Sequence, residues 1–176
     1  MSTRIAVAND AHKMAEIQIN AWLAAYIDLM PADFLKDLNI EETSKNWRRS
    51  LTEANPGIYR VVLNDAGLIT GYCVYGPARD ADLQKQAIGE IVAINILPAE
   101  WRKGYGRELL QAVLAHAEKL RWQAMSLWVI KNNQQARDFY QALGFEADGA
   151  EKYFSTLIKA PLHELRYKKL LGNSET

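Results

Sequence analysis

Cysteine and histidine are scarce in this chain of 176 residues, which has one cysteine and three histidines. A single cysteine cannot form an internal disulfide, and so few thiol and imidazole ligands exclude a Cys-rich zinc site. Net charge is absent as well, because 21 basic side chains balance 21 acidic ones. Nucleic-acid binding needs a clustered basic surface that displaces counterions. We therefore expect neither a metal nor a nucleic-acid partner.

Long hydrophobic runs are also missing. Asp10, Lys13 and Glu16 interrupt the first 25 residues, which argues against a signal peptide, and no later stretch approaches the length of a membrane span. No repeat, low-complexity tract or Pro/Gly/Ser-rich linker divides the chain. The sequence predicts a single domain over residues 1–171 and a short polar tail at 172–176, in the cytoplasm and without a membrane partner.

The hydrophobic pattern of the first half changes from helical to extended. After a short strand at 4–7, apolar residues recur at helical spacing from Asp10 to Met30 and, in two pieces, from 33 to 53. The period then becomes two, which predicts three strands with a hairpin turn between the first two. These strands are 58–63, 68–75 and 88–97.

The second half alternates helices and strands. An amphipathic helix follows Gly104, and a short helix capped by Asn132 or Asn133 ends at Gly144. Strands are expected at 125–130, from 145 onward and at 162–168. This order predicts an α/β layered sheet, mostly antiparallel, with helices on both faces. The strand at 162–168 could pair across a homodimer.

The glycine-bearing segment 101–106 leads directly into the long helix. A helix N-terminus carries unpaired N–H groups and a positive partial charge, and glycines let an anion approach that backbone. Three basic side chains surround it: Arg102, Lys103 and Arg107. The segment predicts a cradle for an anion such as a diphosphate. In the alternative interpretation, Gly104 and Gly106 only permit a tight turn between strand and helix.

Two other phosphate loops fit this segment less well. A Walker A loop needs four residues between its glycines and a Gly-Lys-Ser/Thr ending, and the sequence Gly104-Tyr105-Gly106-Arg107 has neither. The dinucleotide fingerprint wants a small residue where Leu109 stands and an acidic residue where Ile130-Lys131 stands. A nucleotide-binding oxidoreductase therefore remains an alternative with little support.

Two motifs in this order carry a more specific resemblance. The first is Ile94-Asn95-Ile96-Leu97-Pro98 followed by Gly104-Tyr105-Gly106-Arg107-Glu108-Leu109-Leu110, and the second is Asn133-Gln134-Gln135-Ala136-Arg137-Asp138-Phe139-Tyr140 followed by Leu143-Gly144-Phe145. Together they resemble the GNAT superfamily of acyl-CoA N-acyltransferases. That family usually has Gln or Arg where this chain has Trp101. The resemblance implies a GNAT-like mixed, mostly antiparallel sheet of about six to seven strands.

The resemblance implies an N-acetyltransferase that moves acetyl from acetyl-CoA directly to a primary amine of a small molecule or peptide. The alternative is a catalytically inactive, CoA-binding sensor or interaction domain of the same fold. The motif positions carry over a set of acetyl-CoA-binding residues: Ile94, Asn95, Ile96, Arg102, Lys103, Gly104, Tyr105, Gly106, Arg107, Asn133, Ala136 and Tyr140.

The resemblance also implies catalytic roles. Tyr140 matches the tyrosine that protonates the CoA sulfur, and Glu90 matches a strand carboxylate that takes the amine proton, commonly through water. A backbone N–H near Ile96 would stabilise the oxyanion. The same strand would pair its backbone with the pantetheine amides, which implies a cleft between residues 90–97 and 125–130. Four residues are expected to line the acceptor side, namely Trp22, Tyr26, Tyr75 and Arg79. Structural roles are expected for His116 and Cys73.

Overall fold

A computed structural model describes residues 2–53, 55–65, 67–154 and 161–172. Seven strands form one sheet in the order β1-β2-β3-β4-β5-β7-β6. They are β1 (Ser2–Ile5), β2 (Tyr59–Asp65), β3 (Leu68–Pro77), β4 (Ile88–Ile96), β5 (Ala124–Ile130), β6 (Glu146–Phe154) and β7 (Leu162–Leu170). Every neighbouring pair is antiparallel except β4 with β5. This confirms the predicted mixed, mostly antiparallel α/β fold.

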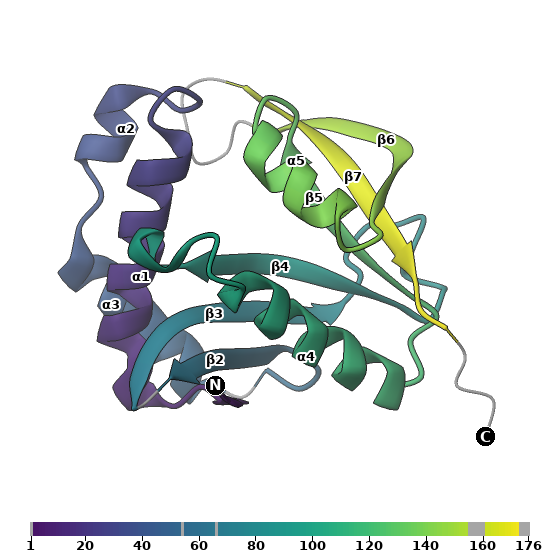
Figure 1. The fold of residues 1–176 in the computed structure, drawn as a ribbon, viewed down its shortest axis with the longest axis horizontal. Helices are drawn as coiled ribbons and strands as arrows, with labels where there is room; N and C mark the ends of the chain where they lie inside the picture. The colour runs from purple at the N-terminus through teal and green to yellow at the C-terminus, as the bar shows by residue number, and fades with distance from the viewer. Residues whose placement is uncertain (1, 54, 66, 155–160, 173–176) are drawn as a thin grey trace.

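Helices cover both faces of the sheet (Figure 1). They are α1 (Ala11–Tyr26), α2 (Ala32–Lys36), α3 (Ile40–Thr52), α4 (Tyr105–Lys119) and α5 (Gln134–Gln141), with short 3-10 turns η1 (Ala8–Asp10) and η2 (Pro98–Glu100). The long helix after the glycines is amphipathic as expected, because its buried residues Leu109, Val113 and Ala117 recur at helical spacing. None of the helices in the described ranges is long and apolar enough to cross a membrane.

Two hydrophobic clusters hold the helices on the sheet. On one face, Met14 and Ile17 of α1 pack with Val62, Tyr72 and Val74. On the other face, the buried residues of α4 and α5 pack with the strands in a larger cluster that includes Leu109, Val113, Leu127, Tyr140 and Phe145. Alternate residues of each strand therefore serve different helix layers.

The C-terminal strand β7 lies inside the sheet and pairs with β5 on one side and β6 on the other. A strand with two neighbours has no free backbone edge to offer a second copy. The expectation that residues 162–168 pair across a dimer is therefore wrong for this strand. In the strand order of the described residues, the outer positions belong to β1 and β6.

Strands β4 and β5 part halfway along their length. Their parallel pairing runs from Ile88 opposite Ala124 to Ile91 opposite Leu127. Beyond these residues β4 continues to Ile96 beside β3 alone, and β5 continues to Ile130 beside β7 alone, among the strands that the structure describes. The sheet thus opens between β4 and β5, as the resemblance implied.

Candidate active site

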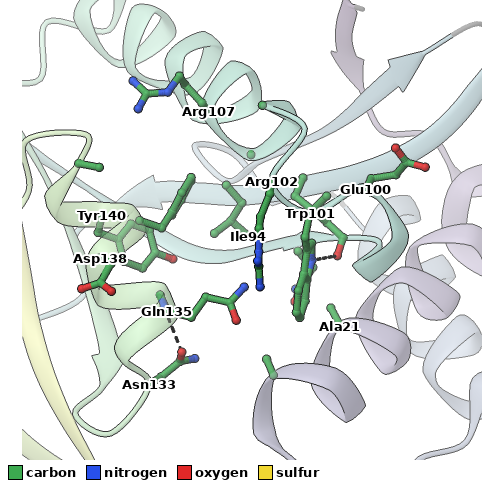
Figure 2. A pocket seen from close by; sticks show the side chains of 18 of the residues that line it. Ala21, Ile94, Glu100, Trp101, Arg102, Arg107, Asn133, Gln135, Asp138 and Tyr140 are labelled. Atoms are coloured by element: carbon green, nitrogen blue, oxygen red, sulfur yellow. Dashed lines mark hydrogen bonds between the residues drawn. The ribbon is translucent and has the colours of Figure 1, made fainter.

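A cavity of about 850 Å³ lies where β4 and β5 part (Figure 2). Its walls come from α1, the outer half of β4, the loop after η2, the start of α4, and α5. Predicted residues make up a large share of this wall: Tyr26, Ile94, Asn95, Ile96, Arg102, Gly104, Gly106, Arg107, Asn133, Ala136 and Tyr140. The cavity therefore brings together both sequence motifs and the first helix.

The loop before α4 has the backbone conformation of an anion cradle. Arg102 and Gly104 both lie in the left-handed region, with φ of 62° and 91°, and Gly104 is the N-cap of α4. Left-handed turns and a helix start leave N–H groups pointing outward, where they can bind phosphate oxygens. The Arg102 side chain extends across the cavity toward Gln135 on α5 (Figure 2). The geometry fits a diphosphate with a basic side chain above it.

Two predicted members of the cradle lie outside the cavity wall. Lys103 makes an ion pair with Glu100 at 3.1 Å on an exposed surface. Tyr105 begins α4 and packs against the core below the helix. Gly106 does line the cavity, and a Cβ added there would lie 3.2 Å from the Phe139 ring. A glycine at this position lets α4 approach α5 closely.

Trp101 donates its indole N–H to the Ile96 carbonyl at 2.8 Å. Leu97 donates its backbone N–H to Thr70 on β3 at 2.9 Å. Because backbone groups of successive strand residues face opposite edges, the N–H and C=O of Ile96 face the edge that β5 has left. Trp101 therefore covers the carbonyl, and the Ile96 N–H faces the opening.

Tyr140 lies on α5 with its side chain at the cavity wall, and it is 9% exposed. Burial raises the pKa of its hydroxyl above the usual range, and the nearby Tyr26 hydroxyl adds to this shift. The phenol is therefore protonated at neutral pH, as a general acid must be, while the raised pKa makes it a weaker acid than a free tyrosine, so that proton transfer requires the negative charge that develops on a departing group. Tyr26, from α1, also lines the cavity.

Asparagines fix the two sides of the cavity. Asn133 caps α5, and its side chain accepts the backbone N–H of Ala136 at 3.0 Å. Asn95 donates to the Tyr72 hydroxyl at 2.9 Å, and Tyr72 and Trp47 both donate to Gln18 of α1, at 3.4 and 2.8 Å. This second network ties β4 to α1 and α3.

Glu90 lies beside the point where β4 and β5 part but does not line the cavity. It is 2% exposed, and its carboxylate accepts hydrogen bonds from Arg79 at 2.6 and 3.0 Å, with a third from the Arg79 backbone. Arg79 is thus placed against Glu90 rather than on the cavity wall. Their predicted roles are not settled by this pairing and stay predictions.

The other two expected acceptor residues also lie away from the cavity wall. Tyr75 is 2% exposed in the core beneath α4, where its hydroxyl bonds to His116 at 3.0 Å. Trp22 packs against Tyr26 and Phe34, with ring centroids 5.8 and 6.2 Å apart. Cys73 is fully buried in the same core as Tyr75.

The sequence analysis missed several wall residues. Ala21 and Ala25 line the cavity from α1, while Gln135 and Asp138 line it from α5. Two alanines one helical turn apart are a sign that something approaches the helix closely, and this spacing was visible in the sequence. The orientation of α1 on the sheet decides which of its faces lines the cavity, and this orientation cannot be read from the sequence directly.

Comparisons with known proteins decide the family. Residues 14–145 match the model of the Acetyltransferase (GNAT) family. The chain belongs to the GNAT acetyltransferase family. Over 143 residues it is 31% identical to the uncharacterized N-acetyltransferase YuaI of Bacillus subtilis. The aligned region covers 81% of this chain and 78% of that protein.

Solved structures share the fold of this GNAT chain. The PaiA N-acetyltransferase of Thermoplasma acidophilum in complex with coenzyme A superposes with a TM-score of 0.73, at 15% identity, over 96% of this chain and 98% of that one. The putative acetyltransferase YncA of Salmonella typhimurium, with its cofactor acetyl-CoA, has a TM-score of 0.68, at 20% identity, over 100% and 96%. The chain is an acyl-CoA-dependent N-acetyltransferase, and acetyl-CoA is the cosubstrate of this family.

Proposed function

We propose that this GNAT enzyme transfers acetyl from acetyl-CoA directly to a primary amine of a small molecule or peptide. The observation that carries the proposal is the opening between β4 and β5, which joins the left-handed loop at Arg102 and Gly104 to Tyr140 in one cavity. A cavity with a phosphate cradle at one end and a protonated phenol at the other suits an acyl thioester on a long phosphate-bearing arm.

The cosubstrate supplies the acetyl thioester. The N–H groups of the loop and Arg102 would hold its diphosphate, with Arg107 adding positive charge. The outer edge of β4 would pair its main chain with the amides of the pantetheine arm, as an added strand does. The Ile96 N–H, which faces that opening, would donate to the thioester carbonyl as negative charge develops on its oxygen.

An ammonium acceptor loses two protons on the way to the amide, and the departing sulfur gains one. For the first proton, whose loss frees the nitrogen lone pair, we assign Glu90 through a water molecule, and the lone pair then forms the C–N bond as the C–S bond breaks. Tyr140 donates its proton to the departing sulfur, so that CoA leaves as a thiol. The second proton on the nitrogen passes through water to Tyr140, and Glu90 releases the first to solvent, so that the products are the N-acetyl compound, CoA and one proton.

The first test is a calorimetric titration of the purified protein with acetyl-CoA, beside CoA and NADH. We expect micromolar binding of both CoA species and none of NADH. Release of CoA thiol is then followed with a panel of primary amines. Absence of CoA binding to folded protein would contradict the cavity assignment. CoA binding without turnover of any amine or peptide N-terminus would instead favour the inactive sensor domain.

A further inference from the structure

A lysine ammonium of this chain sits between an aromatic ring and a carboxylate on the sheet face that carries Glu90. Lys152 of β6 places its Nζ atom 4.0 Å from the centroid of the Trp128 ring. The same atom lies 3.6 Å from a carboxylate oxygen of Glu164 on β7. A tryptophan face attracts a cation within about 6 Å of its centroid, and a carboxylate adds a charge partner. The Trp128 ring and the Glu164 carboxylate together are therefore suited to bind a primary ammonium.

This arrangement lies next to the opening between β4 and β5. On β5, Trp128 is two residues from Ser126, which pairs with Glu90, so that Trp128 and Glu90 share a face. Leu127 and Val129 point the other way, into the core with Tyr140. Glu164 is close enough to Tyr26, which lines the cavity, for its charge to raise the pKa of the Tyr26 hydroxyl.

We propose that Trp128 and Glu164 form a subsite for an ammonium group of the acceptor, and that Lys152 occupies this subsite in the free protein and is displaced by the acceptor. The inference rests on the proposed function and narrows the acceptor to cationic amines.

The Trp128 ring is held in place without Lys152. Its indole N–H donates to Asp80 at 3.0 Å. Arg166 lies farther from the ring, at 5.7 Å, and is tied to Asp80, Asp82 and Asp148 by ion pairs of 3.1, 2.7 and 2.8 Å. These three ion pairs hold the Arg166 guanidinium in this position. The ring face is thus preorganised for a cation.

Lys152 is the displaceable member of the group. Its 3.6 Å contact with Glu164 is longer than a good charge-assisted hydrogen bond, and its side chain is 39% exposed. A lysine on a flexible stem can swing into solvent at little cost. Glu164, in contrast, is mostly buried. Burial raises the pKa of Glu164, the charge of Lys152 opposes the shift, and Glu90 adds to it.

Local charge also favours a cationic acceptor, although the whole chain is neutral. Ion pairs around Trp128 and Glu90 bring together more carboxylates than basic groups: Glu90, Glu164, Asp80, Asp82 and Asp148 against Arg79, Lys152 and Arg166. Lys168 adds a further positive charge near Asp82. When Lys152 swings out, a negative excess remains at the subsite.

The test is a titration that does not depend on turnover. The probe is n-butylammonium chloride, with 1-butanol as the neutral control, and the readout is the indole N–H signal of Trp128 in a nitrogen-15 NMR spectrum, assigned by its loss in Trp128→Phe. We expect butylammonium, but not butanol, to shift this signal. In Lys152→Met the midpoint, which is the butylammonium concentration at half-maximal shift, should fall about tenfold, because the lysine ammonium no longer competes for the ring. In Glu164→Gln the shift should be lost.

Lys36→Met serves as the matched control, because Lys36 also forms a loose lysine–carboxylate pair, at 4.0 Å from Asp33 on α2. It should leave the midpoint unchanged. An equal shift with butanol, or an unchanged midpoint in Lys152→Met, would overturn the subsite. The acetyl-CoA titration is independent of this result, so that failure of the subsite and failure of the proposed function are told apart.

Discussion

Arg79 gives the Glu90 carboxylate three hydrogen bonds, one from its backbone N–H at 3.0 Å and two from its guanidinium at 2.6 and 3.0 Å. The carboxylate is buried, whereas the Arg79 side chain is 61% exposed. The pair fastens the segment after β3 to the strand beside the opening. Any chemistry of Glu90 therefore takes place with Arg79 in contact.

Glu90→Gln should lower kcat by roughly 100-fold if Glu90 takes the amine proton, because a glutamine cannot accept it. The KM for acetyl-CoA should stay the same. Arg79→Ala is the matched variant, since it keeps the carboxylate but removes two of its donors. It should lower the free energy of unfolding by about 1–3 kcal/mol. Glu90→Gln with normal kcat and reduced stability would assign Glu90 to packing alone.

Tyr140→Phe should reduce kcat by about 100- to 1000-fold, because the sulfur then leaves without a proton donor. Acetyl-CoA affinity, measured by calorimetry, should be unchanged, since the phenyl ring keeps its packing against Phe139 and Phe145. Tyr26→Phe provides the comparison of a second cavity tyrosine without the acid role. Equal losses in both variants would argue against Tyr140 as the acid.

The free energy of unfolding should fall at alkaline pH. Burial raises the pKa of Cys73, Tyr72, Tyr75 and Tyr140 in the folded protein. The unfolded chain ionises at ordinary values, about 8.5 for cysteine and 10 for tyrosine. The contribution of these neutral buried groups to the free energy of unfolding is therefore complete below a pH of about 8. It is lost as the pH rises through their raised pKa values in the folded protein.

Urea unfolding between pH 7 and 11 measures this decline. Cys73→Ala should delay its onset toward the tyrosine range, because the group with the lowest unfolded pKa is removed. An unfolding free energy that stays constant up to pH 11 would contradict the buried positions of these side chains.

Two glycine variants separate backbone strain from crowding in the cradle. Gly104→Ala meets no atom within 4 Å but keeps a left-handed φ of 91°, which costs roughly 1–2 kcal/mol. Gly106→Ala has no such φ, but it presses on Phe139. Both should weaken acetyl-CoA binding. Gly149→Ala, at φ 92° in β6, is the control that is strained equally and should bind normally. Weakened binding in that control would attribute the effect to general instability.

Sequence patterns predicted the local parts of the site well. The glycine turn before α4, a cap of α5 at Asn132 or Asn133, and Gly144 at its end each follow from local backbone requirements. The structure confirms them and places the cap at Asn133. The separation of β4 from β5 was predicted from the family resemblance and not from the hydrophobic pattern.

Contacts between distant segments were not predictable in the same way. The pairing of Glu90 with Arg79 depends on the path of the segment after β3, and the ring contact of Lys152 depends on β7 entering the sheet between β5 and β6. Tyr75 shows the same limit, because its strand was predicted correctly, but the sequence does not say that its face of β3 lies beneath α4 and not on the cavity wall.

The free edge of β4 offers peptide groups, which are the same for every amino acid. Side chains at Ile94 and Ile96 can change during evolution without altering these donors and acceptors, provided that the strand keeps its shape. If this edge pairs with the pantetheine arm as proposed, it binds every acyl-CoA in the same way and cannot itself distinguish one acyl group from another. Acyl selectivity and acceptor choice would then depend on side chains beyond the edge, which can change without altering the backbone groups that bind CoA.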